Sequence, residues 1–152
     1  MKLGLQSKEQ VFNFVEFNIS GNSDIYFKCD TESKFLYMDV FNIFVGCFER
    51  SNHIYDFFGA TKYNSRNIIP LKNELHDNLE KIISITNLDE FKGYVAGIFL
   101  GKNLLKELEE QDKRWVTRWH AYHRKLIQVN RSLIALCDKC VLEERTLWVI
   151  NF

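Results

Sequence analysis

The feature that most constrains this chain is a row of apolar residues at helical spacing in its C-terminal third. The row follows intervals of four, three, four, three, four and three and consists of Trp115, Trp119, Tyr122, Leu126, Val129, Leu133 and Leu136. Such intervals place side chains on one face of an α-helix, and no Gly or Pro interrupts the segment. The pattern predicts an amphipathic helix over about residues 113–137, with a basic outer face and Asp112 as its N-cap.

The preceding segment predicts a second helix of comparable length. Asn87-Leu-Asp-Glu90 has the form of an N-terminal cap, and apolar residues at helical spacing follow as far as about Glu110. Within it Gly93, Gly97 and Gly101 recur at every fourth position. We expect a bulky side chain, such as Trp115 or Trp119 of the neighbouring helix, to pack on this glycine stripe. A ligand-facing groove between helices is the alternative.

Two more helices are predicted upstream. Pro70, the only proline, stands where a helix over residues 71–83 would begin, a position at which its missing N–H costs nothing. Thr31 is the expected cap of a helix that runs to about Arg50. The residues between, 51–68, have no clear period and are read as an irregular connection.

Segments near both ends of the chain are expected to supply a small β element. Ser7-Lys-Glu-Gln10 resembles a capping box, so we favour a short helix after it, although the alternation through Phe17 also fits a strand. IYFKC at residues 25–29 and TLWVINF at residues 146–152 are rich in strand-forming residues. The predicted class is therefore α+β and predominantly α, with about five or six helices and a small β element near the termini.

Length and composition predict one domain over residues 1–152. A chain of this length buries roughly 70% of the surface that it exposes when unfolded, and 46% of its residues are hydrophobic. No apolar run is long enough for a membrane span, and the first residues lack the apolar core of a secretory signal. The four cysteines, widely spaced except for Cys137 and Cys140, are typical of reduced thiols. We expect a cytoplasmic protein.

Metal and cofactor chemistry are not expected. His120-x-x-His123 and Cys137-x-x-Cys140 have zinc-ligand spacing. In a continuous helix, however, the two pairs would lie about 21 Å apart, too far for one ion. Phosphate-binding loops and the common hydrolase motifs are missing from the sequence.

The charge pattern argues against direct binding of nucleic acid. The net charge is zero, although residues 113–136 carry basic residues and no Asp or Glu. Basic and aromatic residues together can grip phosphates and stack on bases. Here the tryptophans belong to the apolar row, so they are expected to face the core and not a base.

One short segment resembles a known family. Arg118-Trp-His-Ala-Tyr-His123 is similar to the Arg-x4-His signature of the HEPN family, small all-helical domains that include many ribonucleases of toxin–antitoxin and phage-defence systems. The resemblance implies a homodimeric, metal-independent ribonuclease in which Arg118 stabilises phosphate charge and His123 moves protons. Trp119 departs from the family pattern, which usually has a polar residue after the arginine.

The overall character of the chain resembles another class, the immunity proteins that bacteria pair with contact-delivered toxins. No motif carries this resemblance, so no residue role is transferred from it. Many such toxins are nucleases with basic clefts, so an inhibitor is expected to offer an acidic surface that speeds association. The candidate partner-binding residues are Glu107, Glu109, Glu110 and Asp112. A solvated turn that balances the basic helix is the alternative reading of these carboxylates.

We therefore interpret the chain as a non-enzymatic intracellular inhibitor that occludes a protein toxin. A ribonuclease that uses Arg118 and His123 is the alternative. The sequence leaves open the identity of the partner, the surface that binds it and the oligomeric state.

Overall fold

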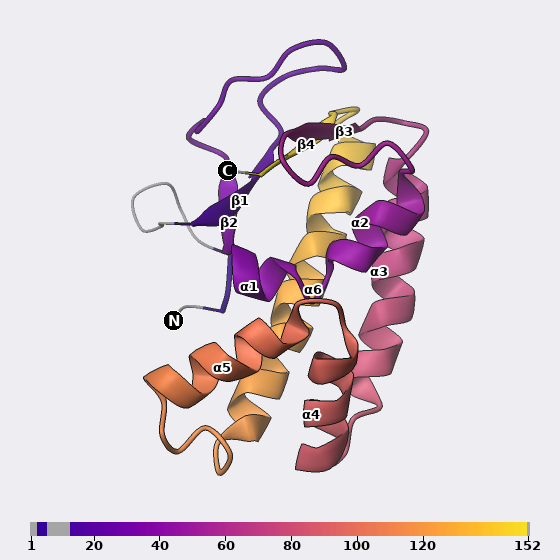
Figure 1. Ribbon diagram of the computed structural model, residues 1–152. Coiled ribbons are helices and arrows are strands. Elements are labelled where there is room, and N and C mark those ends of the chain that lie inside the picture. The colour runs from indigo at the N-terminus through magenta and orange to yellow at the C-terminus, as the bar shows by residue number, and fades with distance from the viewer. Residues whose placement is uncertain (1–2, 6–12, 152) are drawn as a thin grey trace.

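The computed structural model describes residues 3–5 and 13–151, which form six helices and four strands (Figure 1). The elements in chain order are β1 (Phe14–Asn18), β2 (Lys34–Tyr37), α1 (Met38–Phe41), α2 (Val45–Ser51), β3 (Ala60–Tyr63), α3 (Ile68–Ile83), α4 (Leu88–Gly97), α5 (Gly101–Gln111), α6 (Trp119–Leu142) and β4 (Leu147–Asn151). The predicted class, α+β with helix predominating, is confirmed.

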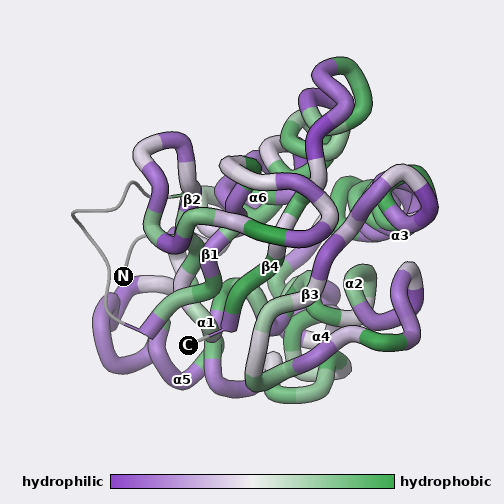
Figure 2. The backbone as a smooth tube through the Cα atoms, turned by 90° about the horizontal axis from the view of Figure 1, so that it is seen from above, coloured by the Kyte–Doolittle hydropathy of each residue, from purple (hydrophilic) through white to green (hydrophobic). Residues whose placement is uncertain are grey.

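The strands form one antiparallel sheet in the order β2-β1-β4-β3, in which the first strand, β1, pairs with the last, β4 (Figure 2). Side chains alternate across β1, as the pleat of a strand requires. Val15 and Phe17 belong to the hydrophobic core. Glu16 and Asn18 point to the other face, where the loop over residues 19–33 covers them and supplies their hydrogen bonds.

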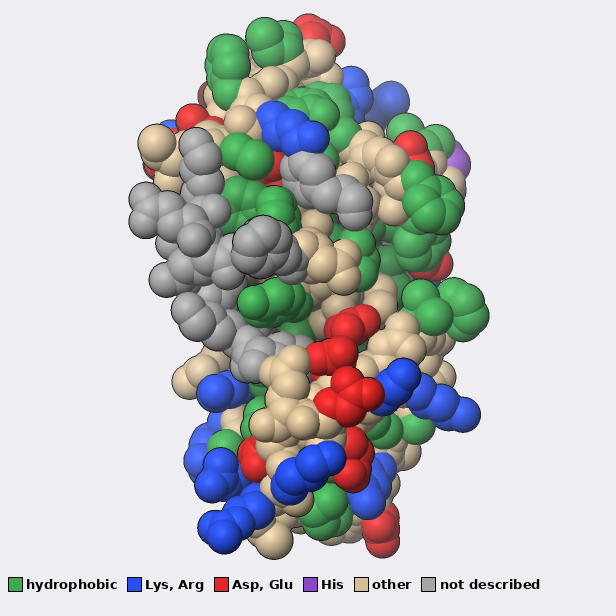
Figure 3. Space-filling model, turned by 60° about the vertical axis from the view of Figure 1, so that its left-hand side comes forward, with side chains coloured by type: hydrophobic (Ala, Val, Ile, Leu, Met, Phe, Trp, Pro, Cys, Tyr) green, Lys and Arg blue, Asp and Glu red, His purple; other side chains and the backbone are tan. Residues whose placement is uncertain are grey.

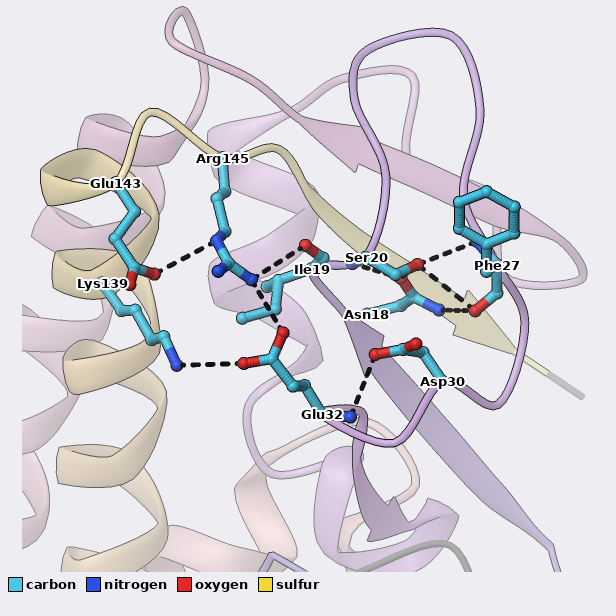
Figure 4. Close-up of polar contacts among 9 residues, drawn as sticks. All are labelled: Asn18, Ile19, Ser20, Phe27, Asp30, Glu32, Lys139, Glu143 and Arg145. Carbon is cyan, nitrogen blue, oxygen red and sulfur yellow. Dashed lines mark hydrogen bonds and ion pairs between the residues drawn. The ribbon is translucent and has the colours of Figure 1, made fainter.

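That loop is also fastened to the end of α6, as Figure 4 shows. Arg145 lies 3.0 Å from Glu32 and 3.2 Å from Glu143, and Lys139 lies 3.7 Å from Glu32. The hydrogen bond from Arg145 is the main reason why the pKa of Glu32 lies below its ordinary value. Asn18 of β1 donates to the carbonyl of Phe27 at 2.7 Å, so the loop is held at its middle as well as near its end at Glu32.

The long helices α3 and α6 pack side by side under the sheet, with α4 and α5 at the far end of the molecule (Figure 1). A chain of buried amides joins three helices. Asn130 donates to the carbonyl of Leu75 at 2.8 Å and accepts from Asn78 at 2.9 Å, and Tyr94 donates to Asn78 at 2.8 Å. The predicted helix over residues 71–83 is confirmed, although it begins earlier, at Ile68.

Four predictions for the N-terminal half are wrong, and three of them fail because pairing between distant strands overrides local preference. The expected helix from Thr31 to Arg50 is instead β2 followed by the short helices α1 and α2. Residues 14–18 form a strand and not a helix, whereas Ser7–Gln10 lies outside the described residues. Residues 25–29 form no strand, and the expected irregular connection contains β3. The predicted C-terminal strand is confirmed as β4.

The predicted helix from Asn87 to Glu110 is interrupted. Asn87 caps α4 as expected, accepting from the backbone N–H of Glu90 at 2.9 Å. At residues 98–100 the chain then turns, with Leu100 in the left-handed region at φ 64°. A Cβ at Gly101 would lie 1.9 Å from the carbonyl oxygen of Val95, so this tight turn requires glycine.

The glycine stripe is not a packing surface. A Cβ at Gly93 or Gly97 would meet nothing within 4 Å, so the expected packing of Trp115 or Trp119 on these positions is wrong. Gly97 instead borders an open groove of about 640 Å³ between α2, α3 and α4.

The last helix starts later than predicted. Residues 113–118 form turns, and Asp112 accepts from the backbone of Arg114 instead of capping α6, which begins at Trp119. The apolar row nevertheless faces the core, because Trp115, Trp119 and Leu126 are buried.

Candidate functional site

The predicted acidic residues lie along the second half of α5 and the turn after it. Glu107 accepts from Gln111 at 2.7 Å, and Glu110 lies 4.0 Å from Lys106. Both contacts are local, between positions four apart on an exposed helix face, so they contribute little to stability. These carboxylates remain available to a partner.

The other two acidic residues hold the turn over residues 112–118 in place. Glu109 accepts from the indole N–H of Trp115 at 2.7 Å. Asp112 accepts from the hydroxyl of Tyr122 at 2.7 Å and lies 3.5 Å from Arg118. The bond from Tyr122 is the main reason why the pKa of Asp112 lies below its ordinary value. Glu109 and Asp112 thus join α5 to the start of α6.

A fifth carboxylate, which the sequence pattern did not single out, belongs to α1, the short helix that packs against α5. Asp39 of α1 is half-buried. Its pKa lies above its ordinary value, mainly because of this burial and secondly because of the negative charge of Glu107. Neither carboxylate has a cationic partner among the ion pairs of the described residues. The expected single helix from Thr31 to about Arg50 gives no reason to single out Asp39, because only the folded chain brings α1 to the edge of a groove.

Beside Asp39 the surface is hollowed and strongly apolar. A groove of about 470 Å³ lies between α1, the loop before β3 and the turn before α5. We call it the α1–α5 groove, and it is lined by Met38, Asp39, Phe57, Phe58, Phe99 and Leu100. Phe58 is 96% exposed and Phe99 is 79% exposed. On the face that carries α1 and α5, Figure 3 shows red carboxylates near the centre with green hydrophobic side chains to their right.

Arg118 and His123 lie at the opposite end of α6 from β4, and both make contacts within the chain. Arg118 is exposed and pairs with Asp112. His123 is half-buried, and its Nε2 lies 2.7 Å from the carbonyl oxygen of Ile82, which can only accept, so this nitrogen carries the proton. Its ring also lies against Trp119, with 5.7 Å between the ring centres.

The cysteine pair is buried inside α6. Burial raises the pKa of Cys137 to about 12 and that of Cys140 to about 11, so both thiols stay protonated at neutral pH. Within the described residues, no group of three or more His, Cys, Asp or Glu side chains is placed to hold a metal ion.

The described helices include none that is long and apolar enough to cross a membrane. Comparison with known proteins finds no matching family model, no matching curated protein and no matching solved structure. The molecule is thus defined by its own geometry: an α+β domain fold that exposes an apolar groove beside two carboxylates.

Proposed function

We propose that this chain is an intracellular inhibitor of the immunity-protein kind, which binds a protein toxin and occludes it. The single observation that carries the proposal is the α1–α5 groove, where aromatic side chains stand in solvent. Contiguous exposed apolar surface on a small protein marks a binding site, because hydrating it is unfavourable unless a partner covers it.

The composition of the groove supports a protein partner. Phe57, Phe58 and Phe99 are large side chains with few rotatable bonds, and such residues act as anchors in the centres of protein interfaces. Asp39 lines the same groove, and α1 packs against α5, which carries Glu107 and Glu110. These carboxylates would attract a basic partner before contact. An inhibitor of a nuclease toxin needs this combination of rapid association and apolar anchoring.

The test places a photo-cross-linking amino acid at Phe58 and identifies the protein captured in the host cell. The captured protein is then expressed in a bacterium with and without this chain. We expect the partner alone to arrest growth, and the chain to restore it. Absence of toxicity, or toxicity that the chain does not relieve, would contradict the proposal.

Matched variants show whether the groove is the surface used. Phe58→Ser combined with Phe99→Ser removes two exposed side chains and should abolish protection while the fold is retained. Leu142→Ser is the control, because Leu142 is 85% exposed at the end of α6 and does not line the groove. If both variants protect equally well, the groove is not the surface that binds the toxin.

A further inference from the structure

We propose that the α1–α5 groove binds a cationic side chain of the partner, an arginine or a lysine, together with an apolar side chain adjacent to it in the partner's sequence. This inference rests on the proposed function, because it assumes a protein partner, and it adds the chemistry that the partner must present.

The carboxylates of Asp39 and Glu107 provide the first reason. They come from the helices α1 and α5, which pack against each other. Burial first, and the negative charge of Glu107 second, raise the pKa of Asp39. No described Lys or Arg is in ion-pair distance of either. Like charges that repel each other without a cation destabilise the folded state. A cation bound at Asp39 in the groove would also be attracted by the charge of Glu107, and the repulsion would be offset.

The aromatic walls provide the second reason. Phe57, Phe58 and Phe99 line the groove that Asp39 also lines, so a side chain that enters the groove can contact both a carboxylate and phenyl rings. A guanidinium is planar and weakly hydrated, and it stacks on aromatic faces while it pairs with a carboxylate. Asn42 and Asn103 line the same groove, and an amide oxygen accepts from a guanidinium.

The size of the groove provides the third reason. At about 470 Å³ it exceeds what one guanidinium fills, and its wall at Phe99 and Leu100 is apolar and exposed. An aliphatic or aromatic neighbour of the cation would cover this wall and exclude water from the ion pair. Exclusion of water strengthens the pair, since charges interact more strongly at low dielectric.

The probe for the experiment is a random peptide library displayed on phage and selected against the full chain. We expect the selected peptides to combine Arg or Lys with an adjacent Leu, Phe or Trp. Binding of the synthesised peptides is then measured against the double variant Asp39→Asn, Glu107→Gln, for which we expect affinity to fall about tenfold or more. Affinity should also fall as salt is added.

The matched control is the double variant Asp77→Asn, Glu80→Gln, which makes the same charge change at two exposed positions of α3. It should bind the peptides like the wild type. Asp39→Asn has a second readout. Since ionised Asp39 is unfavourable in the folded state, this variant should unfold at a higher urea concentration than the wild type at neutral pH. Loss of a carboxylate that stabilises the fold would instead lower the urea concentration at which the chain unfolds.

Three outcomes would overturn the inference: no peptide is enriched, the enriched peptides lack a cation, or their binding is unaffected by the variant at Asp39 and Glu107. A chain that associates with itself through this face, shown by a dimer that the variant dissociates, would also overturn it. None of these outcomes affects the growth test. The inhibitor can protect while the groove binds no cation, and the groove can bind cationic peptides while no toxin is inhibited.

Discussion

The carboxylate of Glu16 is predicted to be the most sensitive polar group of the fold. It lies in the middle of β1 and is fully buried. Its Oε1 accepts from Asn18 Nδ2 at 2.9 Å, from the backbone N–H of Cys29 at 2.7 Å and from Ser33 Oγ at 2.7 Å. Cys29 has a φ of 55°, a left-handed conformation that a non-glycine residue adopts at a cost of about 1–2 kcal/mol. The bond to Glu16 helps to hold it there.

Two substitutions separate the charge from the hydrogen bonds. Glu16→Ala removes the acceptor of three donors, and an unsatisfied buried donor costs about 1–3 kcal/mol. Because the loop over residues 19–33 can open and hydrate some of these donors, we expect a total loss of about 3–5 kcal/mol. Glu16→Gln keeps an oxygen in place and loses only the charge, so we expect a loss of about 1–2 kcal/mol. The total free energy of unfolding of a domain of this kind is about 5–15 kcal/mol, so either loss is a large part of it.

Urea unfolding followed by tryptophan fluorescence measures both losses, provided that the free energy of unfolding falls with urea concentration at the same slope in every variant. Glu80→Ala, an exposed change on α3, is the control and should stay within about 0.5 kcal/mol of the wild type. Hydrogen exchange at the Cys29 amide should accelerate in Glu16→Ala. If that variant lost less than about 1 kcal/mol, the reasoning from the buried carboxylate would be refuted.

Three further results are expected. Gly93→Ala should raise the free energy of unfolding, measured in urea, by about 0.5–1 kcal/mol. The new methyl group meets nothing within 4 Å, and alanine favours a helix more than glycine does. A loss of stability would show that the position is crowded. Tyr122→Phe should raise the pKa of Asp112 toward its ordinary value in an NMR titration, because it removes the hydroxyl that favours the carboxylate. The stability that this bond contributes is present above the pKa that Asp112 has in the unfolded chain, and it is lost as the pH falls through its lower pKa in the folded chain. The free energies of unfolding of the wild type and Tyr122→Phe should therefore converge in acid. If Asp112 titrates identically in both proteins, the role of the hydroxyl is refuted. Induced expression of the wild type should leave bacterial growth unchanged; growth arrest that the double substitution Arg118→Ala, His123→Ala relieves would identify a ribonuclease and overturn the inhibitor.

The sequence by itself determined the elements whose signal is local. The apolar row of α6, the buried face of α3 and the Asn87 cap of α4 depend on residues three or four positions apart, which meet whenever a helix forms. The strand β4 followed from residues that favour extended backbone. The run of carboxylates over residues 107–112 also singles out Glu107 as a candidate partner-binding residue.

Only the tertiary structure decided the elements and sites that depend on distant residues. β1 and β2 exist because they pair with each other and β1 pairs with β4, and α6 begins at Trp119 while Trp115 is held by Glu109. The α1–α5 groove joins side chains from three parts of the chain, near residues 39, 58 and 99. A local pattern carries no information about which segments will meet, because that choice is made by the burial and pairing of the whole chain.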